Sequence, residues 1–147
     1  MSTLTHAQFL ERLGGLKLLS LDTDGVLTDG GLYYTDGGEE LRKFNVKDGM
    51  GIKRAQAAGV KIAIITASST PSIAHRGQSL GVDYVFLDCQ EKLTTLVRIC
   101  DEMGIDLDQV GHVGDDLNDL PVLETVGCPM TVSDATDEAI AAALFVT

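Results

Sequence analysis

Basic residues are scarce in this sequence. Its 147 residues include 11 lysines and arginines against 22 aspartates and glutamates, which gives a formal net charge of −11 at pH 7. Surfaces that bind nucleic acids or anionic membranes need a positively charged footprint. The composition therefore argues against nucleic acid and against a membrane surface as partners.

Long apolar runs are missing as well. The longest, residues 139–146, is far shorter than the ~20 residues that cross a bilayer as a helix. Residues 1–8 have no basic segment followed by an apolar core, so we expect no secretory leader. Cys89, Cys100 and Cys128 show no CxxC spacing. An odd number of cysteines without a pattern is typical of reduced thiols in a cytoplasmic protein and not of a disulfide framework or a zinc site.

No linker rich in Ser, Gly or Pro divides the chain, and no internal repeat is present. The length is that of one domain of ordinary size. The shares of apolar residues (44%) and charged residues (22%) are close to the average for globular proteins, which excludes wholesale disorder. We therefore predict a single domain over residues 1–147.

Short apolar stretches alternate with amphipathic ones. The pattern predicts strands over 16–21, 60–65, 84–87, 110–113, 130–132 and 144–146, and helices over 5–13, 51–58, 71–80, 90–103 and 117–126. Two further strands, 31–34 and 39–46, flank a Gly-rich turn and predict a β-hairpin. Apolar strands that alternate with helices form parallel sheets covered on both faces. The predicted fold is α/β, with a doubly wound, mainly parallel sheet and a small β-hairpin after the first strand.

Polar side chains follow four of the predicted strands. In chain order they are Asp22 and Asp24, then Thr66, then Lys92, and finally Asp115 and Asp116. Ligands of such sheets bind outside the carboxyl ends of the strands. We therefore expect these side chains to meet at one rim of the sheet, and this convergence is the main functional signal in the sequence.

The acidic residues of this set predict a magnesium site. Asp22 and Asp24 are two residues apart in an extended segment, so both carboxylates can face one cavity. Close carboxylates repel, and one pKa rises unless a cation intervenes. Asp115 or Asp116 would complete a cluster of oxygen ligands, which favours Mg²⁺. Because Mg²⁺ usually combines one or two carboxylates with a phosphate oxygen, we expect a phosphorylated substrate.

The other groups suit a phosphoryl centre. The Thr66 hydroxyl can donate a hydrogen bond, and the Lys92 charge can balance the non-bridging oxygens. One carboxylate can act as the nucleophile and form an aspartyl-phosphate. The other can protonate the leaving group and then activate water. The predicted reaction is hydrolysis of a phosphomonoester.

Four segments resemble, in order, the motifs of the haloacid dehalogenase-like phosphatases. They are DTDGVLTDG (22–30), IIT (64–66), Lys92 within QEKL, and GDDLND (114–119). The hairpin and the segment EELRKFNVKDGMGI (39–52) are similar to the subgroup without a cap domain that includes 3-deoxy-D-manno-octulosonate 8-phosphate phosphatase. The resemblance implies that the substrate is a keto-deoxy sugar acid phosphate. A nine-carbon sugar acid phosphate or another sugar phosphate is the alternative.

The resemblance also implies roles for individual residues. Asp22 would be the nucleophile and a magnesium ligand, and Asp24 the acid/base and a ligand through its backbone carbonyl. Asp115 would complete the metal site. Thr66 and Lys92 would hold the phosphate.

Further residues have supporting or substrate-binding roles on the same basis. Asp116 and Asp119 would support the metal site. Lys47, Asp48 and Gly49 follow the hairpin and are candidate substrate contacts. In the subgroup the hairpin packs against other subunits, so the resemblance implies a homotetramer in which a neighbour takes the place of the cap.

The chain departs from this subgroup at three points. Ala67-Ser68-Ser69 follows Thr66 where those enzymes usually carry Gly-Arg or a similar charged pair. Lys47 stands where an arginine with its fork of donors is common. A Gly-rich, Arg-containing tail would begin where the sequence ends, at Thr147. Because none of these positions belongs to the four motifs, the departures concern the substrate and leave the phosphatase core intact.

Two other functions are compatible with this fold. A receiver-like phosphorylation switch also uses an acidic cluster, a threonine and a lysine, but its phosphorylated aspartate stands alone after a middle strand. Here the Asp pair follows the first strand. A non-catalytic assembly module is the second alternative, and the presence of every core catalytic position argues against it.

Overall fold

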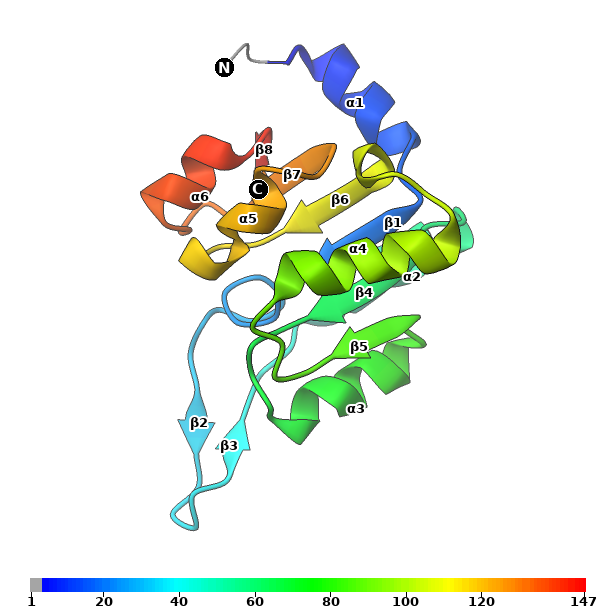
Figure 1. Cartoon of the computed structure of the whole chain (residues 1–147). Coiled ribbons are helices and arrows are strands. Elements are labelled where there is room, and N and C mark those ends of the chain that lie inside the picture. The colour runs from blue at the N-terminus through cyan, green and yellow to red at the C-terminus, as the bar shows by residue number, and fades with distance from the viewer. Residues whose placement is uncertain (1–3) are drawn as a thin grey trace.

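The structure is a computed structural model that describes residues 4–147. Residues 1–3, part of the stretch in which no leader is expected, lie outside the described residues. A six-stranded sheet with the order β5-β4-β1-β6-β7-β8 forms the centre (Figure 1). Its strands are β1 (Leu18–Leu21), β4 (Lys61–Ile65), β5 (Tyr84–Phe86), β6 (Val110–Val113), β7 (Cys128–Thr131) and β8 (Phe145–Val146). Every neighbouring pair is parallel, so all carboxyl ends lie along one edge.

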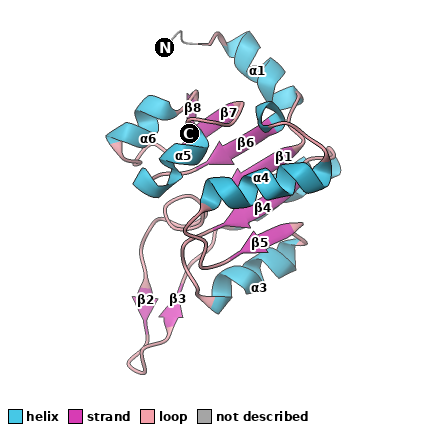
Figure 2. Cartoon of the chain, viewed as in Figure 1, coloured by secondary structure: helices cyan, strands magenta, loops and turns pink. Residues whose placement is uncertain are grey.

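Helices cover both faces of this sheet (Figure 2). They are α1 (His6–Gly14), α2 (Val46–Ala57), α3 (Pro71–Leu80), α4 (Lys92–Met103), α5 (Leu120–Leu123) and α6 (Asp137–Ala142), with short 3₁₀ turns at Leu107–Gln109 and Leu117–Asp119. Side chains alternate along a strand. Accordingly, Ile62 and Ile64 pack with residues of α2 and α3, whereas Ala63 and Ile65 pack with residues of α4. All four are at most 1% exposed, which explains the uninterrupted apolar run and confirms the doubly wound α/β fold.

A two-stranded hairpin extends from the body of the molecule (Figure 1). Its strands β2 (Tyr33–Tyr34) and β3 (Glu40–Leu41) are antiparallel. The connecting turn contains Gly38 with a φ of 87°, a conformation that glycine adopts without strain. Between residues 30 and 45 the described chain forms this hairpin and no cap domain.

Predicted boundaries are wrong both near the hairpin and at β7. The predicted strand 39–46 is shorter, because the Asn45 side chain accepts a hydrogen bond from the Lys47 backbone N–H at 2.8 Å and starts α2 there, five residues before its predicted start. The first turns of α2 contain two glycines, which lower the helix propensity of this segment, so its sequence pattern does not indicate a helix. β7 begins at Cys128 and contains Pro129, a residue that lowers the expectation of a strand.

The C-terminal region also differs from the expectation. The predicted helix 117–126 is divided into a 3₁₀ turn and the short α5, which has a proline in its first turn. Helix α6 was not predicted, although Thr136 accepts a hydrogen bond from the Ala139 backbone N–H at 3.3 Å and two acidic residues follow the cap. Among the described residues, no helix has the length and apolar character needed to span a membrane.

Candidate active site

The polar residues predicted at the strand ends lie at one edge of the sheet. Asp22 follows β1, Thr66 follows β4 and Asp115 lies just beyond β6. These three strands are neighbours in the sheet. A hollow of about 270 Å³ opens there, lined by Asp22, Asp24, Gly25, Gly30, Thr66, Ala67, Ser68, Asp115, Asp116 and Asn118. The topology therefore brings together most of the predicted site residues.

Asp22 is buried and held through one oxygen. Its Oδ1 accepts a hydrogen bond from the Thr23 backbone N–H at 2.7 Å and lies 3.1 Å from Lys92 Nζ. No nitrogen donor among the described residues is bonded to Oδ2. Burial, followed by the charge of Asp119, raises the pKa of Asp22 to about 6, although Lys92 and Thr23 act in the opposite direction. One oxygen is thus fixed by the protein and the other is available for chemistry.

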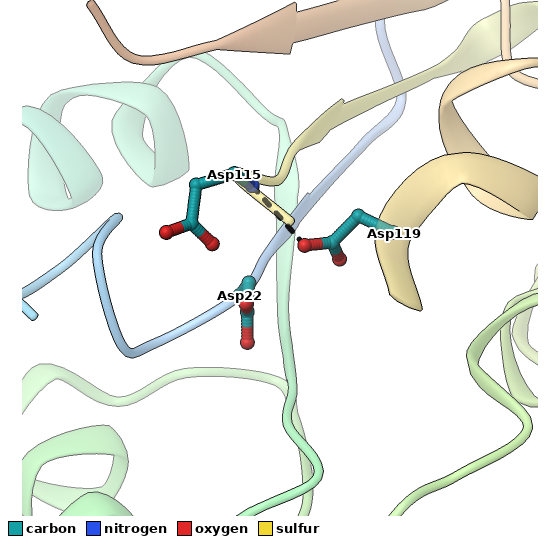
Figure 3. Close-up of side chains that lie close together, drawn as sticks. All are labelled: Asp22, Asp115 and Asp119. Carbon is teal, nitrogen blue, oxygen red and sulfur yellow. Dashed lines mark hydrogen bonds between the residues drawn. The ribbon is translucent and has the colours of Figure 1, made fainter. Parts of the chain in front are cut away.

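Asp115 is the second carboxyl with a raised pKa. Burial, with added repulsion from Asp119 and Asp116, raises its pKa to about 6. Oxygens of Asp22, Asp115 and Asp119 lie within 4.8 Å of one another (Figure 3). Carboxylates this close favour a bound cation, and an all-oxygen donor set fits Mg²⁺. The residues present therefore suit the predicted metal.

Asp119 belongs to this group by distance, but its oxygens are already engaged. Lys92 Nζ donates to Oδ1 at 2.8 Å, and His112 Nε2 lies 2.9 Å from the same oxygen. The backbone N–H groups of Asp115 and Asp116 donate to Oδ2 at 3.1 and 3.4 Å. Four donors match the acceptor capacity of a carboxylate. Asp119 therefore holds the loop after β6 in place, and its supporting role at the metal site stays a prediction.

Lys92 begins α4 and is only 3% exposed. Burial acts to lower its pKa, but the charges of Asp22 and Asp119 outweigh burial and leave the pKa raised. For Asp119 burial acts to raise the pKa, and the hydrogen bond from His112 together with the charges of His112 and Lys92 leaves it lowered. The structure therefore places a permanent positive charge beside the nucleophile candidate.

His112 contributes a buried contact that the motifs do not reveal. His112 lies in the predicted strand 110–113, and the structure shows a fully buried ring whose Nδ1 lies 3.1 Å from Ser20 Oγ and whose Nε2 lies 2.9 Å from Asp119 Oδ1. Ser20 and His112 face each other in the register of β1 and β6. The contact between His112 and Ser20 follows from the pairing of β1 with β6. The sequence does not indicate that these two strands are neighbours, so the contact could not be predicted from it.

Asp24 is bound by an arginine that was not predicted. Arg42, just after β3, places Nε 2.6 Å from Asp24 Oδ1 and Nη2 2.9 Å from Oδ2. Nη2 also donates to Ser68 Oγ at 3.0 Å. The hydrogen bonds to Asp24 raise the pKa of Arg42, although burial opposes this. The Asp24 carboxylate is thus connected both to the hairpin and to the segment after Thr66.

The remaining predicted residues differ in whether they line the acidic hollow. Thr66 is 2% exposed, and its hydroxyl accepts a hydrogen bond from the Ser68 backbone N–H at 3.1 Å. Asp116 is exposed and accepts from the Leu117 N–H at 2.7 Å, which caps the 3₁₀ turn that follows. Lys47 and Asp48 line a separate hollow of about 590 Å³ beside the start of α2.

Gly49, the third candidate substrate contact, is buried in α2. A side chain there would meet the end of the Arg76 side chain and Leu80, so α2 and α3 pack closely at this position. Within one chain, therefore, the three substrate-binding candidates are not brought into the acidic hollow. Their role stays a prediction.

Comparisons with known proteins agree with this geometry. Residues 88–147 match the haloacid dehalogenase-like hydrolase family. The sequence is 38% identical over 141 residues to the 3-deoxy-D-manno-octulosonate 8-phosphate phosphatase KdsC of Escherichia coli K12, covering 96% of this chain and 75% of that protein. It is 39% identical over 132 residues to KdsC of Salmonella typhimurium, covering 90% and 70%.

Solved structures show the same relationship. The crystal structure of 3-deoxy-D-manno-octulosonate 8-phosphate phosphatase from Moraxella catarrhalis, in complex with magnesium, phosphate and KDO, superposes with a TM-score of 0.94 at 30% identity, covering 97% of this chain and 82% of that one. The corresponding enzyme from Yersinia pestis gives a TM-score of 0.91 at 34% identity, covering 95% and 75%.

Proposed function

The chain belongs to the haloacid dehalogenase-like hydrolases, and on that basis we propose that it is a Mg²⁺-dependent phosphatase whose substrate is a keto-deoxy sugar acid phosphate. The observation that carries the proposal is the arrangement at the carboxyl ends of β1 and β6. There Asp22 and Asp115 form an acidic pair, and the Lys92 ammonium lies 3.1 Å from Asp22.

Asp22 acts as the nucleophile in this proposal. Its Oδ2 forms a bond to phosphorus while the bond from phosphorus to the leaving-group oxygen breaks. Asp24 gives its proton to that oxygen, then removes a proton from the water that hydrolyses the aspartyl-phosphate. Inorganic phosphate leaves, and Asp22 returns to its starting form.

Two cationic partners of the phosphoryl group follow from the same arrangement. The Lys92 ammonium directs one N–H toward Asp22 and one toward Asp119, and its third N–H remains for a phosphoryl oxygen. Asp22, Asp115 and the backbone carbonyl of Asp24 would hold Mg²⁺, which neutralises phosphoryl charge when it is bound. The Thr66 hydroxyl completes the set of phosphate contacts.

The substrate class rests on the relatives. The proteins named above are phosphatases of 3-deoxy-D-manno-octulosonate 8-phosphate, and one of the structures contains KDO. A nine-carbon sugar acid phosphate or another sugar phosphate is the alternative substrate. We also propose that residues 1–147 act as one domain and that the protein works in the cytoplasm.

A homotetramer is the proposed assembly. The hairpin has four exposed apolar side chains, Leu32, Tyr33, Tyr34 and Leu41. Packing of this hairpin against a neighbouring copy would cover them and would add a wall to the open acidic hollow. Lys47, Asp48 and Gly49 would then contact the substrate from the rim.

A phosphatase screen tests the function. The protein would be assayed with Mg²⁺ against sugar phosphates that include eight- and nine-carbon keto-deoxy acids, with release of inorganic phosphate as the readout. The matched control is Asp22→Asn, which keeps the size of the side chain and removes the nucleophile. We expect hydrolysis of a keto-deoxy acid phosphate by the parent and none by the variant. Equal rates would contradict the role of Asp22, and a parent inactive on every substrate would contradict the function.

A further inference from the structure

Arg42 forms a bidentate ion pair with Asp24. The two nitrogens Nε and Nη2 meet the two carboxylate oxygens at 2.6 and 2.9 Å, which is the bidentate geometry that fixes the plane of a carboxylate. The Arg42 side chain is only 2% exposed, whereas the Asp24 side chain is 37% exposed. A molecule in the acidic hollow can therefore touch Asp24 while Arg42 stays behind it.

Arg42 is itself held from two sides. Its Nη2 donates to Ser68 Oγ at 3.0 Å, and its Nη1 lies 2.6 Å from Glu40 Oε1. Glu40 in turn accepts hydrogen bonds from Thr70 Oγ1 at 2.8 Å and from Tyr34 Oη at 3.0 Å. The guanidinium thus connects the hairpin with the segment between β4 and α3, and neither part can move far without moving it.

We propose that Arg42 is a positioning residue for phosphoryl transfer, which orients the Asp24 carboxylate toward the leaving-group oxygen. The inference rests on the proposed function and deepens it. A general acid must lie within about 2.6–3.2 Å of the oxygen that it protonates. Each Asp24 oxygen uses one lone pair on Arg42 and keeps another, so the outer side of the carboxyl group can still carry and transfer the proton.

The leaving group separates this role from a structural one. An alkoxide needs a proton as it departs, whereas p-nitrophenolate is stable without one. Loss of an acid-positioning residue therefore affects an alkyl phosphate more than an aryl phosphate. A general loss of structure lowers both rates alike, and a lost substrate contact raises KM.

The experiment compares kcat/KM, with Mg²⁺, for p-nitrophenyl phosphate and glycerol phosphate. Neither substrate has a carboxylate, so recognition of a sugar acid cannot contribute. The variants are Arg42→Met, Arg42→Lys and Asp24→Asn. The matched control is Lys43→Met, since the Lys43 side chain is 68% exposed and lies 3.8 Å from Asp29.

We expect Arg42→Met to lower kcat/KM for glycerol phosphate by roughly 10²-fold or more, in the range of acid–base catalysis, and for the aryl ester by less than about tenfold. Asp24→Asn should likewise lose more activity on glycerol phosphate than on the aryl ester. Arg42→Lys, which keeps the charge without the fork, should fall between the parent and Arg42→Met. Lys43→Met should match the parent on both substrates.

Equal losses on the two substrates, or an effect confined to KM, would overturn the role of Arg42. A parent that hydrolyses neither these two esters nor any sugar phosphate of the screen would overturn the proposed function and this inference with it. Circular dichroism establishes that each variant folds. Should Arg42→Met fail to fold, Glu40→Gln replaces it, because it loosens the support of Arg42 without touching Asp24. The same preferential loss on glycerol phosphate is expected, and its absence would refute the proposal.

Discussion

Without magnesium, the folded protein should lose stability when the pH rises from about 5 to about 7.5. The reason is the pKa of Asp22, which burial and then the charge of Asp119 raise from 3.8 to about 6. A carboxyl group with a raised pKa binds its proton more tightly in the folded state than in the unfolded state. Its stabilising contribution is therefore complete below pH 3.8 and is lost as the pH rises through about 6.

The expected loss can be worked out for Asp22, which is 7% exposed. Between pH 5 and pH 7.5 these two pKa values correspond to a loss on the order of 1 kcal/mol of unfolding free energy. For a domain of this size that is a decrease of roughly 2–4 °C in Tm. Asp115, whose pKa is also raised to about 6, adds to the decrease. Asp119 does not, because its lowered pKa places its titration below pH 3.8.

Thermal unfolding followed by circular dichroism measures the effect. Tm would be recorded at both pH values in excess chelator and again in excess Mg²⁺, which should reduce the decrease because the cation neutralises Asp22 and Asp115. The matched control is Asp115→Asn, in which the decrease should be smaller and the response to Mg²⁺ largely lost. A Tm in chelator that stays constant or rises with pH would refute the reasoning, as would an undiminished response of Asp115→Asn to Mg²⁺.

Three further changes test other parts of the site. Lys92→Met leaves Asp22 and Asp119 without their shared cation, so we expect a loss of about 3–5 kcal/mol in urea unfolding and no hydrolysis. Asp119→Asn removes repulsion from Asp22 and Asp115, so the pH range of the Tm decrease should move downward; an unmoved range would contradict the assigned cause. At Gly25, with a φ of 84°, an added Cβ would overlap the Asp115 carboxylate. Gly25→Ala should therefore weaken Mg²⁺ binding in calorimetry, and parental affinity would argue against Asp115 as a ligand.

The central sheet was predictable because its strands are buried on both faces. Burial of that kind requires an uninterrupted apolar run, as in residues 61–65, and in a chain of mixed composition a short run of β-branched residues indicates such a strand. The start of α2 was not predictable in the same way. Gly49 and Gly51 disfavour a helix, yet Gly49 packs where a side chain would press on Arg76 and Leu80, so tertiary packing outweighs local propensity.

The contacts of the site that were not predicted are likewise those that depend on tertiary packing and not on a local sequence pattern. Strand topology alone sends Asp22, Thr66 and Asp115 to one edge of the sheet. Arg42 comes from a hairpin outside that sheet, and nothing in a linear sequence indicates that a residue 18 positions later will reach Asp24. The partner of His112 depends on strand order, which is likewise a property of the assembled sheet.

The acidic motif after β6 shows most clearly what a sequence alone does not reveal about a site. GDDLND contains three aspartates, and each is a reasonable magnesium ligand by residue type. The difference between them lies in their hydrogen bonds. Asp116 caps the following turn, and Asp119 receives four donors, one of them from Lys92 on a helix that starts far away in the sequence. Asp115 has a raised pKa and faces the hollow, so a cation stabilises its charged form where the protein does not. Ligand and scaffold are therefore distinguished by which carboxylate the fold leaves unsatisfied, and that follows only from three-dimensional contacts.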